Sequence, residues 1–212
     1  MCNGLGFIRP EFVNSIIRGR QNQENIAEKA PRMAMTVPVM KLLKHLLTTA
    51  KMNHEKRRLI WTVACLAFHG SFRIHELLSR KGKEFDPTTT LLGCDLNLHT
   101  ITIGDNQEEV LMVHLKSPKE EKLGGGITVE LFSTGTFSCP VKAYKKWKYV
   151  SKSTMGKASP AFRRPGGQCY TGNDFNKDIK TLLGEHINYD EKRYLSHSFR
   201  AGMASMMASA GR

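Results

Sequence analysis

The sequence predicts an α+β domain in which helices come first, a small antiparallel sheet follows, and helices complete the chain. Three observations support this prediction. Apolar residues recur at helical spacing between residues 39 and 80, the period changes to two between residues 91 and 133, and helical spacing returns after residue 140. The length of 212 residues allows one large domain or a domain with a short appendage.

The first part of the chain divides into a short helix, a linker and a helical region. The stretch EFVNSIIR at 11–18 has helical periodicity, and the polar, basic stretch after it is bracketed by Pro31 and Pro38, as in a linker. Strict helical spacing then begins in VMKLLKHLLTTA. EKRRLIWTVACLAFHG predicts a second, more buried helix, and SFRIHELLSR a short third one. We expect residues 1–35 to hold one helix and the linker, and residues 36–212 to form the main domain.

The middle of the chain predicts strands. LLGCDLNL, TITIGDN, EEVLMVHL and GITVELFS alternate apolar and polar residues, so we expect successive strands in one antiparallel sheet. A turn is predicted at Gly104-Asp105-Asn106 and another at the three glycines 124–126.

The last part of the chain predicts three helices. Pro140 suits a first helical position, with Val141, Tyr144 and Trp147 facing inward. GNDFNKDIKTLL has an apolar stripe made of Phe175, Ile179, Leu182 and Leu183. SFRAGMASMMASAG forms the last helix, with Ser196 as its cap and with core methionines at Met203, Met206 and Met207.

Charge is the unusual property of the composition. Lys and Arg number 32 against 19 Asp and Glu, a formal net charge of +13, which favours a polyanionic partner and nucleic acid first. A well-solvated basic protein of ribosomal type is the alternative. Five scattered cysteines without a C-x-x-C pair argue against a zinc site and indicate a reduced, intracellular protein.

The sequence lacks the marks of secretion or membrane insertion. The N-terminus has no charged region followed by an apolar one, as a secretory signal would have. The longest apolar run, at 59–68, is shorter than the ~20 residues of a membrane span.

Three basic motifs could carry chemistry on a phosphodiester. Arg73 and Glu76 lie three positions apart in GSFRIHELL, close enough for the carboxylate to orient the guanidinium. His197 and Arg200 share a helix face in HSFR. A lysine-rich turn between two strands holds Lys116, Lys119 and Lys122. Each motif alone also has an ordinary explanation: a structural salt bridge, a solvated turn, or a capping histidine.

Taken in order, these motifs resemble those of the tyrosine recombinase (phage-integrase-like) superfamily, and look closest to the enzymes of Crypton, Ngaro and DIRS-type mobile elements. HGSFRIHELL resembles the family's first-arginine segment, and PKEEKLGGGITVEL its lysine hairpin, with Lys119 rather than Lys116 in the lysine register. SCPVKAYKKW resembles the family's C-P-V-x-A helix, SPAFRRPGGQCYTGNDFNKDIKTLL its P-L-F strand and following helix, and LSHSFRAGMASMMASAG its H-x-x-R helix. The resemblance covers nearly the whole chain and implies one helix left from an N-terminal DNA-clamping domain, followed by a mostly helical catalytic domain with a small sheet.

The resemblance also implies a reaction. In this family a tyrosine attacks a DNA phosphate without a metal or a nucleotide cofactor. Arg73 and Arg200 would neutralise the phosphate, Lys119 would protonate the leaving oxygen, and His197 would assist proton transfer, with Glu76 supporting Arg73. The family's tyrosine comes well after the H-x-x-R helix, but the twelve residues after Arg200 include none. We therefore expect a catalytic domain truncated before its nucleophile, which cannot cleave DNA alone.

The expected partners are double-stranded DNA and other recombinase protomers, with no membrane and no metal. Phosphate contacts are expected from basic residues at five positions: Lys44, Lys51, Arg57, Lys122 and Lys142. The alternative function is a non-catalytic remnant of a mobile element that binds DNA or a related recombinase. An RNA-binding domain is disfavoured, because the sequence offers no aromatic stacking platform. The expected location is nuclear.

Overall fold

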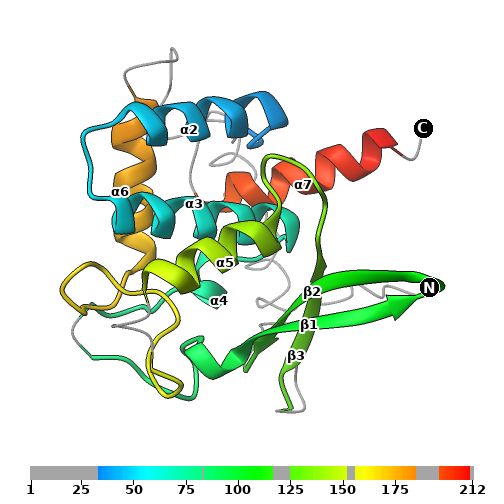
Figure 1. The fold of residues 1–212 in the computed structure, drawn as a ribbon. Coiled ribbons are helices and arrows are strands. Elements are labelled where there is room, and N and C mark those ends of the chain that lie inside the picture. The colour runs from blue at the N-terminus through cyan, green and yellow to red at the C-terminus, as the bar shows by residue number, and fades with distance from the viewer. Residues whose placement is uncertain (1–32, 83, 117–124, 152–155, 185–195, 211–212) are drawn as a thin grey trace, which may run out of the picture. The chain divides into compact units, whose positions relative to one another are not determined.

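The computed structural model describes residues 33–82, 84–116, 125–151, 156–184 and 196–210, and the chain divides into two units, 1–31 and 32–212 (Figure 1). All described residues belong to the second unit. In the last helix the side chains of residues 196–197 and 207–210 also lie outside the description. The short helix and linker expected within residues 1–35 lie outside it too, apart from residues 33–35.

Helix α3 (His54–His69) is the centre of the fold. The side chain of Asn53 caps it by accepting a 2.7 Å hydrogen bond from the Glu55 backbone N–H. All ten residues from 59 to 68 are buried, which confirms the predicted buried helix. Helices α2 (Val37–Thr49), α5 (Pro140–Val150) and α7 (Ser196–Ala210) all contact α3, so it is enclosed by neighbours (Figure 1).

Helix α2 begins earlier than the linker prediction allows. Pro38 lies in its first turn, where the missing proline N–H has no helical partner to lose, so Pro38 belongs to the helix rather than to the linker. The apolar stripe of α2 is buried as its spacing predicts, through Met40, Leu43, Leu46 and Leu47.

The sheet has three strands in the described residues instead of four successive segments. Strands β1 (Leu96–Ile103), β2 (Asn106–Leu115) and β3 (Ile127–Phe132) are antiparallel in the order β1-β2-β3. The first predicted segment, LLGCDLNL, is not a single strand. Its residues Gly93–Asp95 form a 3-10 turn, and its last residues continue into the second predicted segment, TITIGDN, as one strand, β1. A side chain explains the turn: Asp95 accepts a 2.7 Å hydrogen bond from the Leu92 backbone N–H.

The β1–β2 hairpin extends beyond β3. β1 pairs with β2 from Leu96 opposite Val113 to Ile103 opposite Asn106, whereas β3 pairs only with Val110–Leu115. Figure 1 shows the free part of the hairpin projecting from the helices. At the other end of the hairpin the sheet is fixed to the helical core, because the buried Tyr144 hydroxyl donates to the Leu96 carbonyl at 3.1 Å.

The remaining helices follow the sequence predictions. α5 begins at Pro140, and α6 (Gly172–Leu183) covers the predicted residues with its stripe buried. Two expectations are wrong. Met206 is 39% exposed rather than in the core, and Pro160 forms only an isolated bridge with Leu92 instead of a strand. No described helix is both long and apolar enough to cross a membrane.

A pH-sensitive contact joins the end of α3 to the segment before α5. His69 Nε2 lies 3.1 Å from Ser138 Oγ, and burial lowers the pKa of His69 in spite of an opposing hydrogen bond from the imidazole to the Ser138 backbone. The unfolded chain therefore binds this proton more tightly, and stability falls as the pH drops from about 6.5 through the lowered folded pKa. We expect the decline in urea midpoint between neutral and acidic pH to be shallower in His69→Gln, whereas the exposed His45→Gln should follow the wild type. Equal slopes in both variants would contradict this assignment.

Candidate functional site

A tight corner after α3 positions Arg73. Ser71 adopts a left-handed backbone with φ of 50°, and the buried Phe72 ring folds back over Gly70. A Cβ atom on Gly70 would lie 2.3 Å from that ring, so only glycine fits. The corner places Arg73 directly before the short helix α4 (Ile74–Leu77), which is limited to these four residues.

Glu76 orients Arg73 through two contacts. One carboxylate oxygen accepts from Arg73 Nη1 at 3.0 Å, and the other accepts from the Arg73 backbone N–H at 2.7 Å. The Arg73 side chain is 27% exposed and that of Glu76 14%, so the guanidinium is held while part of it faces solvent. The predicted pair at i and i+3 is confirmed as a contact, and it leaves an oriented cation at the surface.

Helix α7 carries Arg200 on its exposed side. The opposite side is fixed in the core by Phe199, whose ring centroid lies 5.4 Å from that of Phe175, and by Gly202. The Met35 backbone N–H also donates to the Ser198 carbonyl at 2.8 Å. Arg200 is therefore an exposed cation on a fixed helix.

Two members of the expected phosphate site lie outside the description. Lys119 is outside the described residues, and His197 lies on α7 one turn before Arg200 with its side chain undescribed. Lys116, the alternative lysine, is engaged elsewhere: its Nζ donates to the Pro87 carbonyl at 2.8 Å and lies 3.0 Å from Asp95 Oδ2.

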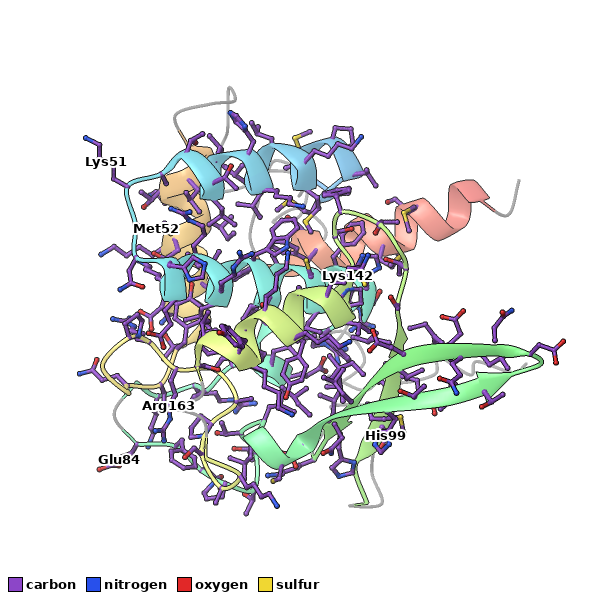
Figure 2. The ribbon with its side chains drawn as sticks, viewed as in Figure 1. Lys51, Met52, Glu84, His99, Lys142 and Arg163 are labelled. Atoms are coloured by element: carbon purple, nitrogen blue, oxygen red, sulfur yellow. The ribbon has the colours of Figure 1, made fainter. Side chains whose placement is uncertain are left out.

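Three of the five residues expected to bind DNA lie around one groove. Lys44 of α2, Arg57 of α3 and Lys142 of α5 line a cavity of about 150 Å³, which we call the basic groove. Lys51 lies instead in a separate depression beside Met52, and Figure 2 shows it far from Lys142. Lys122 is outside the described residues.

Sequence reasoning missed further residues of the basic groove. Arg58 and Lys146 add two cations, and the rings of Trp61 and Phe137 line it as well. Lys146 could have been found from the sequence, because it lies four positions after Lys142 and such residues share a helix face. Nothing local in the sequence indicates that Phe137, in the segment between β3 and α5, belongs beside α2.

Within the described part of the chain, no three His, Cys, Asp or Glu side chains gather as metal ligands.

Solved structures resemble the chain over most of its length. FLP recombinase in a Holliday junction complex matches with a TM-score of 0.52 and 11% identity, over 97% of this chain and 50% of that chain. The Flpe–Holliday junction complex matches with 0.51 and 10% identity, over 100% and 51%. The XerH site-specific recombinase bound to its difH substrate matches with 0.50 and 12% identity, over 85% and 44%. The chain has the recombinase catalytic-domain fold.

The recombinase fold is shown by structure alone. No protein-family model matches the sequence, and no curated protein is significantly similar to it. The chain spans about half of the length of the recombinase chains that it matches. The helices and the three-stranded sheet found here are thus the part that the likeness covers.

Proposed function

We propose that this chain is a DNA-binding protein of the tyrosine recombinase superfamily, which holds a DNA phosphate between Arg73 and Arg200. The observation that carries this proposal is the oriented Arg73 guanidinium, fixed by Glu76 at the corner after α3 in a recombinase fold. The formal charge of +13 supports a polyanionic partner. The likeness to Crypton, Ngaro and DIRS-type enzymes and a nuclear location belong to the same proposal.

Each proposed site residue has a chemical role. Arg73 and Arg200 would neutralise the non-bridging oxygens, because a planar guanidinium can donate two parallel hydrogen bonds to a phosphate. Lys119 would protonate the leaving oxygen, and His197 would move a proton during attack. The engagement of Lys116 by Asp95 supports Lys119 as the acid.

Residues 1–212 are proposed to bind DNA without forming a covalent link to it by themselves. No tyrosine follows Arg200 in this sequence, and Tyr189 and Tyr194 precede the helix that carries it. Recombination would then need a nucleophile from other residues or from another protomer. The second candidate is a mobile-element remnant that binds DNA or a recombinase without chemistry.

Salt-titrated binding to a random duplex tests the proposal. Affinity for DNA should fall steeply as salt rises, because bound cations release counterions. Arg73→Ala and Arg200→Ala should each weaken binding by about tenfold, the loss expected for one charge-assisted contact. Lys157→Ala, at an exposed residue away from the proposed site, is the matched control. Salt-independent binding, or equal affinity in all three variants, would reject the phosphate site.

Incubation with a nicked suicide duplex separates the two candidate functions. If residues 1–212 lack the nucleophile, no covalent adduct forms with this chain alone. An adduct that Tyr194→Phe or Tyr189→Phe abolishes would overturn the non-covalent proposal.

A further inference from the structure

We propose that the basic groove between α2, α3 and α5 is a docking site for an acidic peptide segment of a protein partner, which inserts one apolar anchor side chain. Neither Arg73 nor Arg200 is among the residues that line the groove, so this proposal does not depend on the proposed phosphate site.

The charged residues among the described lining of the groove are all positive. Its described lining residues include no carboxylate, and its cations are Lys44, Arg57, Arg58, Lys142 and Lys146. The neighbouring pocket between α3 and α6 is different, because there Lys56 pairs with Asp178 at 2.7 Å and Arg164 pairs with Asp174. Clustered cations without a carboxylate among the described lining residues favour a ligand that supplies several carboxylates.

The floor of the groove is apolar and holds Lys44 in place. The ring centroids of Trp61 and Phe137 lie 6.3 Å apart, and Lys44 Nζ is 5.6 Å from each of them. Lys44 also donates to the Phe137 carbonyl at 3.2 Å. A cation that is already ordered loses little side-chain entropy when a carboxylate binds it.

Arg57 provides a further donor at the edge of the groove. Its Nη2 donates to the Ala50 carbonyl at 3.2 Å, which fixes the guanidinium. Its Nε atom is buried and has no hydrogen-bond partner among the described residues. Because Arg57 lines the groove, its fixed guanidinium adds to the positive charge there.

The size of the groove favours a single anchor side chain. Its volume of about 150 Å³ is smaller than the roughly 300–1,000 Å³ of small-molecule sites. Protein partners often concentrate binding energy in one side chain that fills a pocket inside a polar rim. An apolar residue flanked by Asp or Glu matches this floor and this rim.

Duplex DNA fits the groove less well. A duplex presents phosphates on its outer ridges and would leave the apolar floor unfilled.

Fluorescence anisotropy with synthetic peptides tests the proposal. The probe is a fluorescein-labelled peptide in which Glu and Asp flank one Phe, compared with the same peptide carrying Ser instead of Phe. Lys142→Glu/Lys146→Glu, at two exposed positions of α5, should weaken the Phe peptide by at least about tenfold. Lys148→Glu/Lys157→Glu makes the same charge change outside the groove and should alter its affinity by less than about twofold. Phe137→Ala should reduce the affinity of the Phe peptide to that of the Ser peptide.

Each other outcome overturns the proposal. A Phe peptide that does not bind, or that binds all variants equally, shows that the groove is not a docking site. If a random duplex displaces the peptide and Lys142→Glu/Lys146→Glu weakens both ligands equally, the groove belongs to DNA. Circular dichroism of each variant confirms that the fold is retained.

Discussion

Replacing Gly202 with alanine is expected to lower the free energy of unfolding by about 3 kcal/mol. Glycine within a helix is normally less favourable than alanine by about 1 kcal/mol, so an unobstructed site would give a gain. Here a Cβ atom at residue 202 would lie 2.1 Å from the Met35 carbonyl oxygen and 3.1 Å from the Phe68 ring. Met35 is held by its hydrogen bond to Ser198, so the backbone cannot simply withdraw.

Urea denaturation followed by circular dichroism measures this cost. Gly82→Ala is the matched control, because among the described residues the only atom within 4 Å of its Cβ position is a Thr171 methyl carbon at 3.9 Å. The Gly202→Ala midpoint should fall well below that of the wild type, while the control stays close to it. A raised midpoint for Gly202→Ala would mean that helix propensity dominates and that the close approach of α7 is absent.

Replacing Gly70 with alanine is expected to destabilise the domain by about 2 kcal/mol and to weaken DNA binding. The backbone of Gly70 is helical, with φ of −86°, so alanine is allowed by the backbone, but the Phe72 ring opposes its Cβ. Three atoms of that ring would lie between 2.3 and 2.6 Å from the new Cβ. The ring is buried, so the clash can be relieved only if residue 72 moves. That movement would also shift Arg73, the next residue.

A double-mutant cycle isolates this contact. Phe72→Ala alone should cost about 3–5 kcal/mol, because it leaves a cavity in the core. In the Gly70→Ala background the same change should cost less by about 1 kcal/mol or more, since it also removes the clash. Additive costs in urea denaturation would show that the Phe72 ring does not confine residue 70.

The fold class and most helices could be predicted because their signals are local. The apolar stripe of α6 has helical spacing from Phe175 to Leu183, and its predicted limits match the structure. The strands were less predictable. The 3-10 turn at Gly93–Asp95 depends on one Asp95 hydrogen bond, which alternation of apolar residues does not reveal.

The candidate site was likewise predictable only where its contacts are local in the sequence. The Arg73–Glu76 contact could be predicted from its spacing, because both residues lie on one turn. The basic groove could not, since Lys44, Arg57 and Lys142 come from three helices and converge only through packing around α3. The net charge indicated a polyanionic partner. It did not indicate which cations of the protein already contact its own carbonyl groups and aromatic rings.

The hydrogen bond between Met35 and Ser198 connects the segment just before α2 to α7, the helix that bears Arg200. A force on the chain just before α2 would therefore reach α7 through this hydrogen bond. The position of Arg200, the proposed phosphate-binding arginine on α7, would then depend on how residues 33–35 are held.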